Sequence, residues 1–337
     1  SSSSAAANTN DTFFAATTGI ITTAIDGPTT FFSRQTGNWN AAATWSTVTY
    51  GNATNASGTF PQAGDIVNIG NATLTITVNV NAVCGSISFL GNVDESATLS
   101  INTGISLDVS GTISIPRTSI FSGEVNTLAV GDGILTASII DFSGGGFVGQ
   151  NELTIGAGSI TAGDITADGV FISYADIIFT DTGTIQVTGE FLNSLNGTLT
   201  AGTGSISYTG NSAQVVGDFT YNDLTLSGTG SKTFADAIDV KGDNKFSNST
   251  PVNTGAFTHT FAGDWTNNGA TIDNSNSTIF FDGGTPTIGG TTATDFKNLT
   301  IDNASVTFDF VTDVSATFAI QNGGVANLGA ILTHTAK

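Results

Sequence analysis

Apolar residues along this chain occur in short runs in which every second position is apolar, as at residues 105–109, 206–208 and 224–226. Gly, Asn, Asp or Thr follows most of these runs. A period of two places one set of side chains on a buried face and the other in solvent, so each run predicts a half-buried β-strand. No comparable window keeps a helical period. The pattern therefore predicts an all-β protein.

The C-terminal part of the chain contains a duplication, with copies at about residues 205–274 and 278–337. The offset between matched positions stays between 73 and 75 residues. Internal repetition of this kind is typical of folds in which each unit packs on the next. A unit of about 74 residues fits roughly three turns of about 25 residues, stacked at the ~4.8 Å spacing of paired strands. The matched residues include Ile206 and Ile279, Leu224 and Leu299, Phe234 and Phe308, Val240 and Val314, and His259 and His334.

We predict a right-handed parallel β-helix, that is a β-solenoid, at residues 37–337, preceded by an N-terminal extension at residues 1–36. The handedness follows the general rule for parallel crossovers. Glycines such as Gly104 and Gly111 are expected at corners that need positive φ or close backbone approach. Duplicated apolar residues are expected to point inward and to stack in equivalent layers; these are Leu224, Leu226, Phe234, Leu299, Ile301 and Phe308.

Residues 11–34 differ from the rest because their apolar residues come in pairs. Paired apolar residues indicate burial on both faces of a segment. Such a segment either caps the first turn of its own solenoid or adds to another chain, and both alternatives stay open. In the second case, the residues in contact between subunits are Phe13, Phe14, Ile20, Ile21, Ile25, Phe31 and Phe32.

The composition narrows the classes of partner. The chain has 337 residues, of which 39% are hydrophobic, and its 23 Phe argue against disorder. Lys and Arg number 7 against 27 Asp and Glu, so the net charge is −20. That charge excludes binding to nucleic acid through a basic surface. No apolar run approaches the ~20 residues of a membrane span. The absence of Met is expected of a processed or excerpted chain.

Two segments resemble those of secreted surface proteins from the Bacteroidetes phylum. Gly37-Asn38-Trp39, Thr44-Trp45-Ser46 and Pro61-Gln62-Ala63-Gly64-Asp65 resemble a segment that leads into a β-helix, and they are also similar to the opening of the G8 type of β-helical domain. Residues 219–226, 261–269 and 296–301 resemble adhesin-like repeats. The resemblance implies a β-helix, an extracellular or cell-surface location and an adhesive role.

Candidate catalytic residues are sparse. His259 and His334 occupy the same repeat position, which favours a structural role over catalysis. Cys84 lies in an alternating run and is expected in the core rather than as a reactive thiol. The alternation at residues 73–77 is of the kind found in ice-binding proteins, but it is a single run. A mild acidic cluster is interpreted as turn residues: Asp164, Asp168, Asp176 and Asp181. The sequence therefore predicts no catalytic residue, no cofactor and no metal site.

The main functional hypothesis is a secreted, non-enzymatic structural or adhesive protein, either a cell-surface adhesin or a fibre subunit. The second copy of the duplication stops after His334 and Thr335 without a polar capping segment. We therefore expect either that more chain follows in the parent protein or that another subunit docks there, and the second case gives self-association from head to tail. A glycan or another cell-surface ligand is a further expected partner. The alternative is a carbohydrate-binding or polysaccharide-degrading β-helix protein, which an exposed acidic and aromatic groove would favour. The fold alone does not decide between them.

Overall fold

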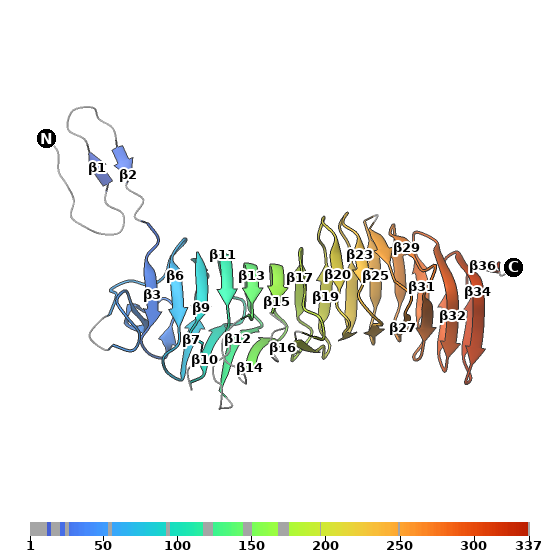
Figure 1. The fold of residues 1–337 in the computed structure, drawn as a ribbon, viewed down its shortest axis with the longest axis horizontal. Coiled ribbons are helices and arrows are strands. Elements are labelled where there is room, and N and C mark those ends of the chain that lie inside the picture. The colour runs from blue at the N-terminus through green and yellow to red at the C-terminus, as the bar shows by residue number, and fades with distance from the viewer. Residues whose placement is uncertain are drawn as a thin grey trace.

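The chain folds into an elongated parallel β-solenoid, drawn in Figure 1 with its long axis horizontal. The computed structural model forms about 12 turns, and the all-β prediction is confirmed. The short 3-10 helix η1 (Ala42–Thr44) is the one helical element in the part of the chain that the structure describes. The described residues are 12–14, 21–23, 27–52, 56–91, 95–116, 124–143, 150–167, 175–195, 197–248 and 250–335.

A 16-stranded sheet, here called the long sheet, runs through the solenoid from end to end. Three of its strands, β11, β13 and β15, are long enough to cover two walls. The first half of β11 pairs with β8 on one wall and its second half pairs with β9 on the other. A register shift between Val109 and Thr112 marks the corner between the two walls. The strands are β3 (Thr30–Ser33), β5 (Trp45–Ser46), β6 (Ile66–Ile69), β8 (Ala82–Cys84, off the main path), β9 (Ser86–Phe89), β11 (Ser106–Ser114), β13 (Ile134–Asp141), β15 (Ser159–Thr166), β17 (Thr184–Val187), β19 (Ser205–Tyr208), β22 (Asp223–Leu226), β25 (Asn244–Ser247), β28 (Trp265–Asn268), β31 (Thr287–Gly290), β33 (Ser305–Phe308) and β35 (Val325–Leu328).

A seven-stranded side sheet closes the N-terminal half, and two other sheets take over in the C-terminal half. The side sheet contains β4 (Gly37–Asn38), β7 (Leu74–Val78), β10 (Ala97–Ile101), β12 (Val125–Gly131), β14 (Gln150–Ile155), β16 (Ala175–Phe179) and β18 (Gly197–Thr200). The four-stranded sheet contains β20 (Gln214–Val216), β23 (Lys232–Phe234), β26 (Pro251–Asn253) and β29 (Thr271–Asp273). The second seven-stranded sheet contains β21 (Thr220–Tyr221), β24 (Asp239–Val240), β27 (Thr258–Phe261), β30 (Thr278–Phe281), β32 (Thr294–Asp302), β34 (Thr312–Gln321) and β36 (Leu332–His334).

The interior is a continuous stack of alternate apolar residues, as the strand pattern predicts. The six duplicated apolar residues are all at most 2% exposed, so their inward orientation is confirmed. Their placement in equivalent layers is wrong. Leu224 lies in the long sheet and its counterpart Leu299 in the second seven-stranded sheet. Phe234 lies in the four-stranded sheet and Phe308 in the long sheet.

Turn length explains this error. In the N-terminal half, Ile160 pairs with Ile185, 25 residues further on, as predicted. In the duplicated half, Leu224 pairs with Asn244, only 20 residues further on. The duplication offset of about 74 residues is therefore not a whole number of local turns. Matched residues consequently fall on different walls, and the prediction of three 25-residue turns per unit is wrong there.

Corners are held by side chains that satisfy the backbone of the next turn. The carboxylate of Asp223 accepts the N–H of Asp243 at 2.8 Å, and Asp264 in turn accepts the N–H of Thr287 at 2.7 Å. Glycines are needed at corners for two different reasons. Gly104 has φ +72 in open space, whereas a Cβ on Gly111 would lie 2.7 Å from the Gly85 carbonyl oxygen. Both reasons expected for corner glycines therefore apply, at different positions.

The N-terminal end of the solenoid is covered by its own chain. Trp39 and Trp45 are fully buried, with ring centroids 5.3 Å apart, and Trp45 Nε1 donates to the Trp39 carbonyl oxygen at 2.7 Å. Phe31 packs edge-on against Trp45. Because β3 pairs with both β5 and β6, residues 30–33 already belong to the solenoid, ahead of the expected boundary at residue 37.

Candidate interaction surfaces

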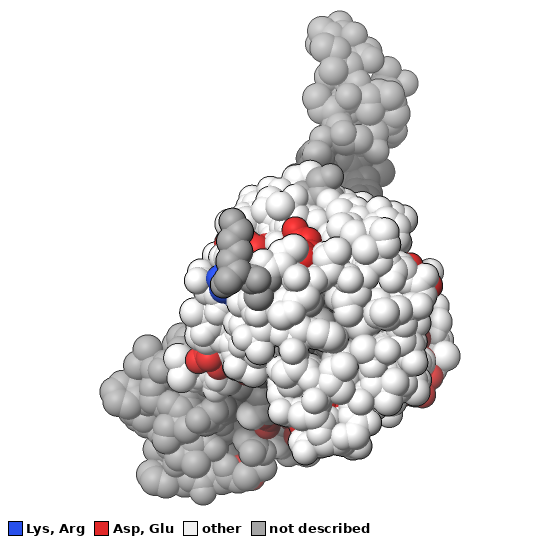
Figure 2. Space-filling model, turned by 90° about the vertical axis from the view of Figure 1, so that its right-hand side faces the viewer, with Lys and Arg blue, Asp and Glu red and all other residues white. Residues whose placement is uncertain are grey.

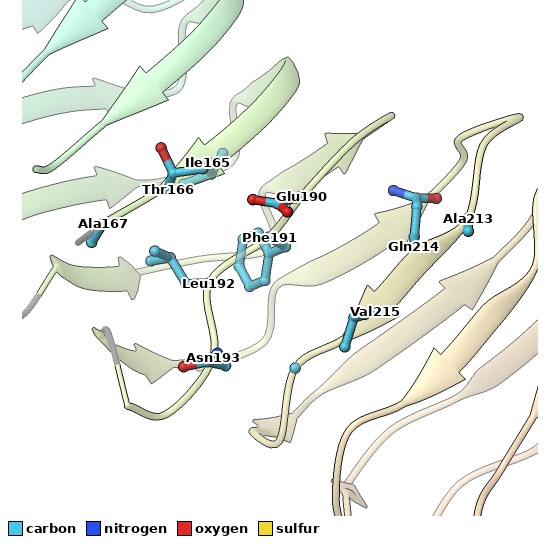
Figure 3. Close-up of a pocket in the computed structure, with 11 residues that line it drawn as sticks. Ile165, Thr166, Ala167, Glu190, Phe191, Leu192, Asn193, Ala213, Gln214 and Val215 are labelled. Carbon is cyan, nitrogen blue, oxygen red and sulfur yellow. The ribbon is translucent and has the colours of Figure 1, made fainter. Parts of the chain in front are cut away.

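A pocket of about 280 Å³ opens halfway along the solenoid, where the side sheet ends at β18 and two new sheets begin at β20 and β21 (Figure 3). We call it the junction pocket. Three segments that lie far apart in the sequence line it. Its lining residues are Ile165, Thr166, Ala167, Glu190, Phe191, Leu192, Asn193, Ala213, Gln214, Val215 and Gly217.

The second halves of β11, β13 and β15 form one wall of the solenoid, here called the second wall. The pocket exists because one turn supplies no strand to this wall. Successive turns place the second halves of β13 and β15 on this wall, and β20 follows beyond the junction. In the turn between them, the backbone carbonyl oxygen of Glu190 still accepts the N–H of Ile165 at 2.9 Å. The chain then leaves the wall, and Phe191 and Leu192 turn into the core. The wall therefore has a gap between β15 and β20.

Buried polar groups hold the rims of this gap in place. The side-chain amide of Gln214 donates to the carbonyl oxygen of Gly189 at 2.7 Å and accepts the N–H of Gly210, also at 2.7 Å. It thereby replaces a backbone partner that the wall lacks. Behind it, the Tyr208 hydroxyl accepts the N–H of Gly217, and the Tyr221 hydroxyl donates to the carbonyl oxygen of Gly217. These bonds fix the backbone that forms one side of the pocket.

The same network sets the protonation of nearby groups. Burial raises the pKa of Tyr208 to about 12, and burial also raises the pKa of Tyr221 well above its usual value. Both hydroxyls therefore stay neutral. Lys232 is fully buried, and its Nζ donates to the carbonyl oxygens of Gly210 and Gly230, each at 2.9 Å. Burial lowers the Lys232 pKa because the charged form loses its hydration.

The rim of the pocket is acidic and partly apolar. The carboxylate of Glu190 is exposed and receives no hydrogen bond or ion pair from the described part of the chain. On the rim, Val215 is 58% exposed, and Leu195 nearby in the sequence is 79% exposed. At Asp218, burial would raise the pKa, but hydrogen bonds from the Ser194 hydroxyl and N–H outweigh it and lower the pKa. The pocket therefore combines an apolar floor with negative charge at its edge.

The C-terminal end of the solenoid is a second candidate surface, here called the end face. The long sheet ends there at β35 and the second seven-stranded sheet at β36. Figure 2, which views the molecule from this end, shows a mostly uncharged surface. Large apolar residues near it are strongly exposed: Val311 (43%), Ile320 (48%), Val325 (46%), Leu328 (66%) and Ile331 (64%). Open strand edges and apolar side chains thus occur together.

Among the residues predicted to contact another subunit, those that the structure describes fall into two groups. Phe31 is 1% exposed in its own first turn, and Phe32 packs edge-on against Tyr50, with ring centroids 5.0 Å apart. These two belong to the solenoid. Ile20 and Ile25 lie outside the described residues.

The other three predicted contact residues belong to a separate hairpin. Phe13 and Phe14 lie in β1 (Thr12–Phe14), and Ile21 begins β2 (Ile21–Thr23). Among the described strands, β1 and β2 pair only with each other, antiparallel. Figure 1 shows the pair standing apart from the solenoid at its N-terminal end. The covering of the first turn is therefore provided by residues 30–45 rather than by these two strands.

The two histidines differ in environment despite their matched positions in the sequence. His259 is fully buried; its Nδ1 accepts the N–H of Ile238 at 3.2 Å, and its Nε2 lies 2.7 Å from the carbonyl oxygen of Thr254. The ring is therefore the neutral tautomer with hydrogen on Nε2. Burial lowers its pKa. His334 is exposed, and its Nε2 lies 2.9 Å from the carbonyl oxygen of Ala316.

Cys84 and the acidic residues also have structural partners. Cys84 is 2% exposed, and burial, followed by the charges of Asp65 and Asp108, raises its pKa to about 12. Asp164 accepts the N–H of Glu190 at 2.7 Å, as a corner residue does. In the part of the chain that the structure describes, no three His, Cys, Asp or Glu side chains gather as metal ligands would.

The remaining members of the acidic cluster are dispersed. Asp181 accepts the N–H of its neighbour Thr182 at 2.8 Å, and Asp176 bonds to the Thr198 hydroxyl on the outer face of the side sheet. Asp168 lies outside the described residues. On the same outer face, Thr75 pairs in register with Thr98, and Thr98 with Thr127, but Glu152 and Asp176 then interrupt the row. The threonine alternation thus extends over only three successive turns.

Sequence reasoning missed the junction pocket, although one signal was present. Phe191 and Leu192 are adjacent apolar residues that break the alternation, just as the pairs near the N-terminus do.

No helix among the described residues is long and apolar enough to cross a membrane. Comparison with protein-family models, with curated proteins and with solved structures finds no match for this chain.

Proposed function

We propose that this protein is a secreted, non-enzymatic structural or adhesive protein that assembles head to tail into an extracellular fibre. The observation that supports the proposal is the end face. It combines two open sheet edges with exposed apolar side chains, of which Leu328 and Ile331 are about two-thirds exposed. An open edge offers a row of unpaired backbone groups, and another strand satisfies them readily.

The two ends of the solenoid are unlike each other, and this determines the kind of assembly. The N-terminal end has edge strands of only two residues, β4 and β5, and the paired Trp39 and Trp45 beneath them. Short edge strands protect against strand addition. Contact between unlike ends is heterologous and gives an open filament unless the rotation between subunits closes a ring.

The hairpin of β1 and β2 is the segment of this chain best suited to cover the end face of a neighbouring copy. It stands apart from the solenoid, and residues 12–25 between Asp11 and Asp26 carry no charged side chain. An uncharged strand avoids repulsion in a protein of net charge −20. The low charge content, 10%, and the resemblance to Bacteroidetes surface proteins support a secreted location.

Assembly is tested by sedimentation velocity and electron microscopy of the 337-residue chain, compared with Leu328→Glu and Ile331→Glu. Both side chains are mostly exposed, so the substitutions leave the core intact. We expect filaments from the original chain and monomers from both variants. Ile134→Glu is the matched control, because Ile134 is 47% exposed in β13, far from either end, and should still assemble. A chain that stays monomeric at its highest soluble concentration would refute the proposal.

Deletion of residues 1–26 tests the role of the hairpin separately. If the hairpin covers the end face of the next copy, the shortened chain remains a folded monomer. If the shortened chain still forms filaments, the end face contacts the neighbouring solenoid directly and the hairpin is not the donor.

A further inference from the structure

The gap in the second wall exposes backbone groups that a strand would normally satisfy. In β20, Gln214 donates its N–H to Ser231 at 2.8 Å, and Val216 accepts the N–H of Ala235 at 3.2 Å. Both residues therefore direct their backbone groups toward β23. In a parallel ladder alternate residues point to opposite neighbours, so the N–H and C=O of Val215 point the other way, into the junction pocket. Among the described strands, none pairs with β20 on that side.

The opposite rim has a matching open position. The N–H of Ile165 donates to the backbone carbonyl oxygen of Glu190. The backbone groups of Ile165 therefore lie on the pocket side of β15. The Ile165 carbonyl would accept the N–H two residues after Glu190, but the chain has left the wall by then, and no hydrogen bond from the described residues reaches this oxygen. Figure 3 shows Ile165 and Val215 on the two sides of the gap.

We propose that the junction pocket binds an extended polypeptide segment of another protein by strand addition, with an apolar side chain on the pocket floor and a Lys or Arg beside Glu190. This inference deepens the adhesive function proposed above, because it gives the class of ligand. It does not require filament assembly, since β15 and β20, whose residues line the pocket, lie far from β36 at the end face (Figure 1).

Strand addition explains the features of the pocket together. The open backbone at Val215 and Ile165 supplies hydrogen bonds that are independent of the ligand's side chains. Phe191 and Leu192, both at least 93% buried, form an apolar floor for alternate side chains. Glu190 and the net charge of −20 favour a basic segment and hasten its encounter with the protein. An extended polypeptide suits these groups better than a sugar, because Phe191, the one aromatic residue in the lining, turns its ring into the core rather than presenting a face to solvent.

The probe is a dye-labelled seven-residue peptide, Thr-Lys-Val-Thr-Val-Lys-Thr, acetylated and amidated at its ends, with binding measured by fluorescence anisotropy. Its alternation places the two valines on one face. Two matched peptides serve as references, one with Glu in place of both Lys and one with Pro in place of the central Thr. We expect the lysine peptide to bind at least ~10-fold more tightly than either reference.

Three variants of the protein separate the parts of the proposal. Val215→Pro removes the N–H that faces the pocket without removing any N–H bonded to β23, and proline is tolerated at such an edge position; it should weaken binding about tenfold or more. Val215→Ala keeps the N–H and should bind nearly as tightly as the original chain. Glu190→Gln should weaken the lysine peptide several-fold and leave an uncharged version unaffected. Circular dichroism and thermal melting confirm that each variant is folded.

The outcomes are distinguishable from those of the assembly test. Equal binding by Val215→Pro and Val215→Ala, with both folded, would overturn strand addition. Binding that appears only after deletion of residues 1–26 would show that a second copy of this chain occupies the gap, and it would also overturn the proposal. Leu328→Glu should bind the peptide normally even though it does not assemble, so failure of the fibre leaves this inference standing.

Discussion

The carboxylate of Asp243 accepts the backbone N–H of Asp264 over 3.0 Å, at the same corner one turn further along the solenoid. Asp223 stands in the same relation to Asp243. The carboxylates of Asp223, Asp243 and Asp264 therefore lie one above another along one corner, and each accepts a backbone N–H of the next turn. Asp243→Ala should destabilise the protein by about 1 kcal/mol, because the Asp264 N–H loses its partner.

The matched variant is Asp243→Asn, which keeps the acceptor oxygen and removes the repulsion between neighbouring carboxylates. It should be at least as stable as the original chain. Urea unfolding midpoints at low and moderate salt measure both effects. If Asp243→Asn is as destabilised as Asp243→Ala, the charge itself holds the corner and the hydrogen-bond explanation is wrong.

Asn244 is an inward-facing residue between Leu224 and Trp265 in the long sheet, and it is only 1% exposed. Neither its Nδ2 nor its Oδ1 has a hydrogen-bond partner among the residues that the structure describes. Replacing an unsatisfied buried amide by an apolar group of similar size removes a desolvation cost. Asn244→Leu should therefore stabilise the protein by about 1–3 kcal/mol in urea unfolding.

Asn126 provides the contrast for that measurement. It is equally buried, but its amide accepts the N–H of Ala97 at 3.2 Å and donates to the carbonyl oxygens of Leu90 and Pro116. Asn126→Leu should destabilise the protein, because three backbone groups lose their partner. If both substitutions change the free energy of unfolding in the same direction, the stabilising role assigned to the Asn126 hydrogen bonds is wrong.

His259 makes stability depend on pH. Its pKa in the folded protein is lowered, mainly by burial, so the unfolded chain binds a proton more readily than the folded one. Its stabilising contribution is present above the unfolded pKa of about 6.5 and is lost progressively as the pH falls below that value. Urea midpoints should decline from pH 7.5 to 5.5, and His259→Gln should flatten the decline. His334→Gln, which alters the exposed histidine, should retain it.

Polysaccharide cleavage is the main alternative activity for a β-helix protein. We expect no release of sugar from a panel of neutral and acidic polysaccharides, as measured by reducing ends. Glycoside hydrolysis needs a pair of carboxyl groups at a defined separation. Product whose formation is abolished by Glu190→Gln would assign an enzyme function to the junction pocket and overturn the non-enzymatic proposal.

The sequence predicted what depends on residues near one another in the chain. Alternation located strands such as β22 and β32, because a period of two follows directly from the pleat. It did not reveal which wall each strand occupies, since this depends on the summed lengths of several corners. Leu224 and Leu299 match in sequence and still lie in different sheets.

The candidate site was harder to predict for a related reason. The junction pocket combines Ile165, Glu190 and Val215, which meet only because one turn leaves the second wall. Nothing in the alternation around Val215 indicates that its neighbouring strand is missing. The N-terminal covering was easier in principle, because Trp39 and Trp45 stand out by residue type, although their contact with Phe31 required the folded chain.

The junction also has a mechanical consequence. Hydrogen bonds between turns run along the long axis of the solenoid, so tension between its two ends loads them in series. Elsewhere two or three ladders share this load, but at the junction the long sheet, from β17 through β19 to β22, is the only one of the described sheets that continues without a break. Under tension the solenoid should therefore rupture first between β18 and β20. The two halves would separate there while each stays folded.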